Sequence, residues 1–156
     1  APLAEAVVET LERLGPSAAS LETVCCLVAT SPLLQVKSLA AGLELMVSDQ
    51  LDAVVSVQRF RSPILRAMKY DEEGYLRRIW PEYQLTRSQD LTEAWHDAGQ
   101  FYWVRRSALM RDRKLIAGKA RGYTLPPLDA VDIDNIEDWS LAEQLYQFHH
   151  SAKQPD

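Results

Sequence analysis

The sequence is poor in cysteine, and this limits the chemistry that it can support. Its only two cysteines, Cys25 and Cys26, are neighbours, and a bridge between adjacent residues would need a strained vicinal disulfide. We therefore expect two reduced thiols in the core. The histidines, His96, His149 and His150, form no Cys/His cluster with them, and no C-x-x-C pair is present. Zinc sites and thiol redox chemistry are therefore not supported.

The chain also lacks an excess of positive charge and any long apolar run. Seventeen Lys and Arg face 22 Asp and Glu, for a net charge of −5, so we predict no nucleic-acid partner and no membrane partner. No stretch approaches the ~20 apolar residues of a membrane span, and the N-terminus has no signal-peptide pattern. We expect a soluble, cytoplasmic protein. At 156 residues with 47% hydrophobic content, it should form a single domain over residues 1–156.

Periodicity predicts an α/β fold with a mostly parallel sheet. Apolar residues at helical spacing predict helices, and continuous apolar runs predict buried strands that alternate with them. Between the second strand and the third, a hairpin over 68–77 turns at Gly74, and a long polar loop follows over 81–97, as in functional or subunit-contacting loops. The predicted helices cover 3–14, 36–46, about 107–110 and 136 to about 148, and the strands 24–29, 53–57, 101–104, 123–125 and 130–132.

Two carboxylates follow the last predicted strand. In a strand, residues i and i+2 share a face, so Asp132 and Asp134 would point the same way. Like charges at that range are tolerated with a cation between them, with one protonated, or with both solvated. Oxygen ligands of this kind suit Mg²⁺ that is shared with substrate phosphates. The alternative is structural: Asp134 with Glu137 fits a helix N-cap, and Asp132 fits a solvated loop acid.

Other polar groups gather in two places. Thr30 and Ser31 follow the first predicted strand, where ligands of α/β proteins bind, although sequence alone favours an ordinary strand-to-helix turn with a Ser or Thr cap. The segments 86–90 and 95–103 combine a guanidinium, amides, an imidazole and aromatics that fit a sugar with a carboxylate. Each of these residues also has a plain structural explanation, as a surface ion pair or a core side chain. The pair His149–His150 suits the charge at a helix C-terminus.

Three motifs stand out in this order along the chain: Ala29–Pro32, Trp80-Pro81-Glu82 leading to Thr86–Trp103, and Val131–Asp134 with Glu137–Trp139. Together they resemble the motifs of the cytidylyltransferases that activate nine-carbon acidic sugars, most closely their pseudaminic acid branch. The resemblance covers about residues 3–146, as the later two-thirds of a family member, and implies a three-layer, Rossmann-like nucleotidyltransferase fold.

The resemblance assigns roles to single residues. It implies that Asp132 and Asp134 bind a catalytic Mg²⁺. It also implies that Gln89 and Tyr102 line the sugar site, and that Thr30 and Ser31 lie beside the nucleotide. The remaining candidates for sugar contacts, from branch similarity and polarity together, are Arg87, His96, Asp97 and Gln100.

Three departures from the sialic acid members argue against sialic acid as the substrate. His96 and Ala98 stand where those members usually have an Arg and an Asn, and Val28 replaces a common Gln. The resemblance therefore implies the reaction of CTP with pseudaminic acid to give CMP-pseudaminic acid and pyrophosphate, for surface or flagellar glycans. The alternatives are a CMP-N-acetylneuraminic acid synthetase and a non-catalytic oligomerisation or sugar-binding module.

The resemblance also implies a homodimer. A dimerisation excursion over about residues 66–90 would reach across to complete the neighbour's sugar site. Family members begin with a strand and a Gly-rich basic loop that cradles the triphosphate, and no such loop is found in these 156 residues. Because a triphosphate needs those donors, we expect a domain truncated at its N-terminus that is inactive alone.

Overall fold

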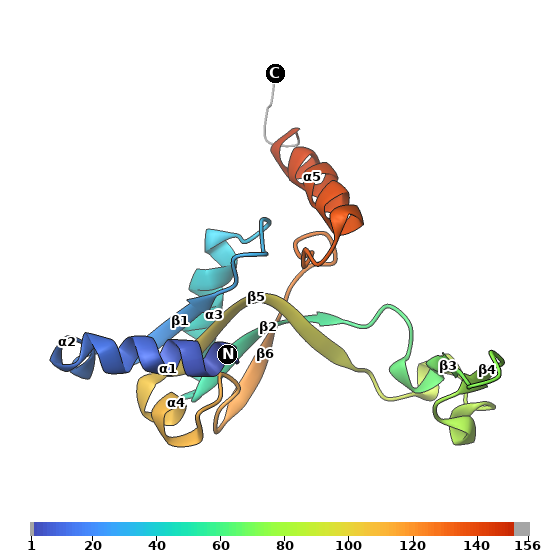
Figure 1. Cartoon of the computed structure of the whole chain (residues 1–156), viewed down its shortest axis with the longest axis horizontal. Helices are drawn as coiled ribbons and strands as arrows, with labels where there is room; N and C mark the ends of the chain where they lie inside the picture. The colour runs from blue at the N-terminus through green and yellow to red at the C-terminus, as the bar shows by residue number, and fades with distance from the viewer. Residues whose placement is uncertain (1, 152–156) are drawn as a thin grey trace.

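The computed structural model describes residues 2–151, which form a mixed α/β domain with a projecting hairpin and a final helix (Figure 1). Three 3-10 turns, Ile64–Arg66, Pro81–Tyr83 and Ser88–Asp90, lie between β2 and β5. The helices are α1 (Leu3–Leu14), α2 (Pro16–Ala19), α3 (Val36–Ser48), α4 (Arg106–Asp112) and α5 (Ile136–Ser151). The strands are β1 (Thr23–Leu27), β2 (Ala53–Arg59), β3 (Met68–Tyr70), β4 (Leu76–Arg78), β5 (Trp95–Arg105) and β6 (Ala120–Thr124).

The main sheet has the strand order β1-β5-β2-β6. Strand β5 is antiparallel to both β1 and β2, whereas β2 and β6 are parallel. Strands β1, β2 and β6 therefore run the same way, with β5 reversed between the first two. The predicted α/β class is confirmed. The sheet is mixed, however, because the longest strand, β5, runs antiparallel to both of its neighbours.

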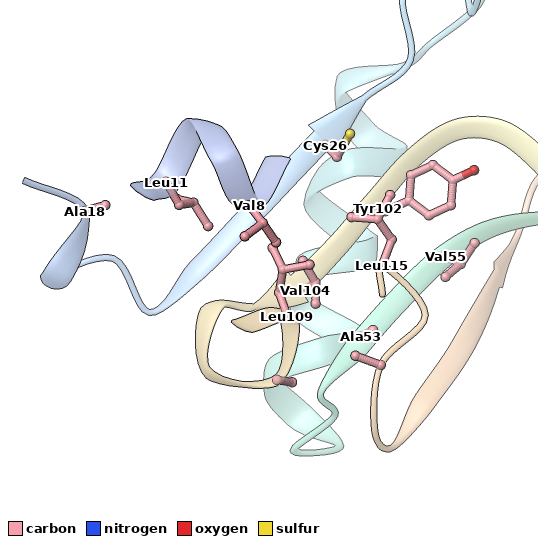
Figure 2. Close-up of a cluster of buried hydrophobic side chains, with 12 residues drawn as sticks. Val8, Leu11, Ala18, Cys26, Ala53, Val55, Tyr102, Val104, Leu109 and Leu115 are labelled. Atoms are coloured by element: carbon pink, nitrogen blue, oxygen red, sulfur yellow. The ribbon is translucent and has the colours of Figure 1, made fainter. Parts of the chain in front are cut away.

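Helices cover both faces of this sheet, as alternation along the strands requires. On one face, α1 and α4 pack against Tyr102 and Val104, in a cluster that includes Val8 and Leu109 (Figure 2). On the other face, α3 packs against the side chains of the same strands that point to that face, among them Phe101. The result is three layers: helix, sheet, helix.

Strand β1 is less buried than its apolar sequence predicts. It lies at the edge of the sheet, and of its five residues only Cys26 is buried while Leu27 is 51% exposed. The two thiols are free, as predicted. Cys26 joins the cluster under α1, and Cys25 packs on the α3 side with Leu39, so adjacent positions serve opposite faces.

The hairpin is confirmed, with β3 paired to β4 and Gly74 in its turn at a φ of 83°. The polar loop after it is shorter than predicted, because β5 already begins at Trp95. The strand predicted over 130–132 is wrong, since residues 130–133 have no regular secondary structure. Figure 1 shows the hairpin projecting well away from the main sheet.

Helix α5 stands beside the turn that follows β1. Its buried residue is Ala142, and a cavity of about 330 Å³ separates it from Pro32 and Ile133. His149 ties the helix to the loop before it: its Nε2 lies 3.0 Å from the Leu128 carbonyl oxygen and 3.3 Å from Asp129 Oδ1. His149, predicted with His150 to be solvated or to compensate the charge at the helix C-terminus, lies in the last turn of α5 and contacts the loop as well. Among residues 2–151, no helix has the length and apolar character needed to cross a bilayer.

Replacing Gly42 by Ala should destabilise the protein, although alanine favours helix by about 1 kcal/mol. A Cβ at Gly42 would lie 2.9 Å from Phe101 Cε2 and 3.3 Å from Trp103 Cδ1, and overpacking a core of this kind typically costs about 1–3 kcal/mol. Urea unfolding of Gly42→Ala measures the net effect of helix propensity and overpacking on the free energy of unfolding. Ala40→Gly, at an exposed position of the same helix, reports the propensity alone. A higher urea midpoint for Gly42→Ala would contradict the close packing of α3 on the sheet.

The Cys25 thiol should make stability depend on pH in the alkaline range. Burial, with a smaller effect of Cys26, raises the pKa of Cys25 from 9.0 to about 11. The folded state therefore keeps a proton that the unfolded chain loses, and this contribution to stability declines as pH rises from about 9 to 11. Urea unfolding at pH 8, 9, 10 and 11 should show less decline for Cys25→Ala than for the natural chain. Equal pH profiles would contradict a raised pKa.

Candidate functional site

The candidate site lies at the edge of the sheet where β1 ends. Thr30 Oγ1 donates a hydrogen bond to Asp132 Oδ1 at 2.8 Å, across 102 residues of sequence. Ser31 is buried, its hydroxyl donates to the Val28 carbonyl oxygen, and its amide donates to the same oxygen at 3.3 Å. The predicted nucleotide motif and the predicted metal motif are therefore in direct contact.

Asp132 and Asp134 are both exposed, although no strand carries them. Along 131–134 burial alternates, with Val131 and Ile133 partly buried and the two aspartates exposed. The strand from which a shared face was predicted is absent, because the segment pairs with no strand. A common side for the two carboxylates stays a prediction.

Asp134 is not the cap of the last helix. The side chain of Asn135 has that role, because its Oδ1 accepts hydrogen bonds from the amides of Glu137 and Asp138, both at 2.9 Å. Asp138 Oδ2 in turn accepts from the amides of Asp134 and Asn135, both at 3.1 Å. This is a capping box one residue later than predicted. It leaves the Asp134 carboxylate exposed and outside the cap.

Asp97 and Tyr102 are joined to each other near Asp132. The Tyr102 hydroxyl donates to Asp97 Oδ2 at 2.5 Å, and Asp97 Oδ1 accepts from the Gly99 amide at 2.9 Å. Burial first, then the hydrogen bond and charge of Asp97, and to a smaller extent the charge of Asp132, raise the pKa of Tyr102. The phenol therefore keeps its proton at neutral pH. Figure 2 shows the ring at the rim of the apolar cluster with its hydroxyl turned away.

Gln100 lies in the interior, which the sequence did not indicate. It is fully buried, its Nε2 donates to the Asp129 carbonyl oxygen at 2.6 Å, and its Oε1 has no hydrogen-bond partner among the described residues. The carboxamide holds the loop that leads to Asp132. In this arrangement Gln100 positions the loop, and its predicted direct contact with a sugar has no geometric support.

His96 is exposed at the far half of β5. Its Nδ1 lies 2.8 Å from the Asp97 carbonyl oxygen, and its ring packs on Phe60 with centroids 4.9 Å apart. The imidazole borders two cavities, of about 270 and 400 Å³. Because a carbonyl oxygen can only accept, Nδ1 is the donor and Nε2 is directed elsewhere. His96 is therefore available to a ligand in either cavity.

Arg87 and Gln89 lie on the excursion, apart from the Asp132 group. Arg87 Nε pairs with Asp90 Oδ2 at 2.8 Å, with the arginine side chain 73% exposed. Gln89 borders a cavity of about 290 Å³ at the foot of the excursion, together with Arg61 and Glu93. Within one chain, these two predicted sugar contacts do not gather with Asp132 and Tyr102. Their roles stay predictions.

The donor chemistry at Asp132 and Asp134 fits a hard divalent cation that is shared with phosphates. Within residues 2–151, no three His, Cys, Asp or Glu side chains come together as a cation-binding group. Protein side chains there do not enclose a cation fully. Mg²⁺ commonly takes one or two carboxylates and completes its shell with water and substrate phosphates. The two exposed aspartates meet that requirement, and the ion itself stays a prediction.

No family model matches the chain. A pseudaminic acid cytidylyltransferase of Campylobacter jejuni serotype O:2 is 33% identical over 129 residues, which is 83% of this chain and 56% of that protein. The enzyme of that name from serotype O:23/36 is 31% identical over 147 residues, 94% of this chain and 63% of that protein. N-acylneuraminate cytidylyltransferase A of Danio rerio is 29% identical over 140 residues, 87% of this chain and 32% of that protein.

The chain thus spans 56–63% of the length of the two Campylobacter relatives. The similarity extends over 83% and 94% of the chain for these two relatives. It confirms the resemblance that the three motifs indicated, and its pseudaminic acid branch. The chain is a homologue of the pseudaminic acid and N-acylneuraminate cytidylyltransferases.

Proposed function

We propose that this chain forms the cation-binding and sugar-binding part of a CTP-dependent cytidylyltransferase that activates pseudaminic acid. The observation that carries the proposal is the similarity to two pseudaminic acid cytidylyltransferases over 83% and 94% of the chain. The geometry supports it independently, because Thr30, Asp132 and Tyr102 meet at the edge of the sheet where α/β proteins bind ligands. The wider role is the supply of an activated sugar for surface or flagellar glycans.

The proposed reaction is nucleotidyl transfer. The anomeric hydroxyl oxygen of the sugar acid attacks the α-phosphorus of CTP, and a new phosphorus–oxygen bond forms. The bond between the α-phosphorus and the bridging oxygen breaks, pyrophosphate leaves with that electron pair, and the hydroxyl proton passes to solvent. Such transfers depend mainly on positioning and on stabilisation of phosphate charge.

Each side chain at the edge has a part in this reaction. Asp132 and Asp134 hold Mg²⁺, which when bound supplies positive charge to the phosphates. Tyr102 keeps its proton and donates a hydrogen bond to Asp97, so its oxygen can accept a hydrogen bond from the substrate. Asp97 keeps further acceptor capacity for sugar hydroxyls. His96 completes the polar wall beside them.

A homodimer is part of the proposal. The excursion over 66–90 carries exposed apolar side chains, among them Tyr70 at 74% and Leu85 at 93%, and it projects from the domain (Figure 1). Arg87 and Gln89 lie there, apart from Asp132. A second copy that packs on the excursion in a two-fold arrangement would cover this surface and bring Arg87 and Gln89 to the neighbouring site.

An N-acylneuraminate substrate is the second candidate, favoured by the similarity to the Danio rerio enzyme. Parallel assays of pyrophosphate release with CTP and either pseudaminic or N-acetylneuraminic acid separate the two. Because the relatives are longer than this chain, turnover is assayed on a protein of their full length. Turnover with neither acid would favour a non-catalytic sugar-binding or oligomerisation module.

Asp132→Asn and Asp134→Asn should each lower kcat by roughly a hundredfold, because each removes a charged cation ligand worth about 3 kcal/mol of transition-state stabilisation. Pyrophosphate release at saturating CTP and Mg²⁺ is the measurement. Asp49→Asn is the matched control, since Asp49 forms an exposed ion pair with Arg121 and should leave kcat near that of the natural enzyme. If both site variants retain natural turnover, neither aspartate serves the cation.

Leu85→Asp should weaken the proposed dimer at least tenfold, because a charge would be buried in an apolar contact. Sedimentation equilibrium of the natural chain and the variant measures the dissociation constant. Val47→Asp is the control, because Val47 is 61% exposed on α3 and outside the excursion. A natural chain that stays monomeric at high concentration would argue against the dimer.

A further inference from the structure

The hydroxyl of Thr30 is already committed within the protein. A threonine hydroxyl has one hydrogen to donate, and in this structure Thr30 donates it to Asp132 Oδ1 at 2.8 Å. A phosphate oxygen can only accept a hydrogen bond, so Thr30 cannot serve a nucleotide phosphate and Asp132 at the same time. Its side chain therefore acts on the carboxylate.

Thr30 is itself fixed in position, so its hydroxyl can restrict the rotation of the Asp132 carboxylate. Its turn is fixed by the next residue, because buried Ser31 donates both its amide and its hydroxyl to the Val28 carbonyl oxygen. Asp132, by contrast, lies on an exposed segment with no ladder of backbone hydrogen bonds. An aspartate in such a segment has rotational freedom that a single strong hydrogen bond can remove.

Gly99 bounds the same carboxylate on its other side. Gly99 has a φ of 62°, and a Cβ there would lie 3.1 Å from Asp132 Oδ2. Its conformation is supported by the bond from its amide to Asp97 Oδ1 at 2.9 Å. The Asp132 carboxylate therefore lies between a donor at Oδ1 and the Gly99 backbone near Oδ2.

We propose that Thr30 is a positioning residue for Asp132, fixing the carboxylate so that it can bind the divalent cation. This inference rests on the proposed function, because it assumes that Asp132 serves a cation. Hydrogen-bond partners of metal ligands typically contribute about 10–100-fold to metal affinity. Thr30 should contribute within that range through Asp132 alone.

The test measures Mn²⁺ affinity of the 156-residue chain, with Mn²⁺ in place of Mg²⁺, from broadening of backbone amide signals and from water proton relaxation. Thr30→Val keeps the shape and removes the donor, so it should weaken Mn²⁺ binding by about tenfold or more. Thr30→Ser keeps the hydroxyl and should bind nearly as the natural chain does. Thr10→Val is the matched control, because Thr10 donates only to a carbonyl oxygen within its own helix.

A second pair of variants isolates the route through Asp132. Thr30→Val added to Asp132→Asn should cause no further loss of Mn²⁺ affinity, because the group on which Thr30 acts is already changed. Urea unfolding confirms that each variant is folded. Unchanged affinity in Thr30→Val, or an equal loss in both backgrounds, overturns the positioning role. A natural chain that shows no Mn²⁺ effect at residues 132–134 overturns the cation site and this inference with it.

Discussion

The pairing of β5 with both β1 and β2 is the constraint on which the rest of the structure depends. Tyr102 is opposite Cys26 on one side and Val55 on the other, so the central strand receives hydrogen bonds along both edges. This pairing brings the end of β1 next to the middle of β5, where the Val28 amide donates to the Gln100 carbonyl oxygen and the register with β2 shifts. It sets the place at which the loop carrying Asp132 can close over the sheet. Helices α1, α3 and α4 then cover the two faces that this strand order creates.

Local elements could be predicted from the sequence where one face of a helix or one turn residue decided the outcome. The stripe of α1 gave its bounds, and Gly74 marked the hairpin turn. The direction of β5 could not be predicted, because strand direction depends on partners far away in the sequence. The strand expected at Val131–Asp132 failed for a related reason: β-branched residues favour extended backbone, but a strand needs a neighbour to pair with.

The candidate site, like the fold, could be predicted only in part from the sequence. The motifs and the resemblance selected Asp132, Thr30, Asp97 and Tyr102 as candidates, but the sequence could not predict that Thr30 hydrogen-bonds to Asp132 and Tyr102 to Asp97. Gln100 was selected from branch similarity and polarity together, and its burial in the middle of β5, where the register with β2 shifts, could not be predicted from the sequence. The signal that could have been used for His149 was its helical spacing from Leu145, which places it on the inner side of α5.

Tyr102 belongs to two parts of the molecule at once. Its ring completes the apolar cluster beneath α1, and its hydroxyl forms the polar pair with Asp97. The demands of packing and of chemistry therefore fall on one side chain and cannot vary independently. A substitution that removes the whole Tyr102 side chain would disrupt the packing of the core and the polar contact with Asp97 together. Removal of the hydroxyl alone would lose only the polar contact.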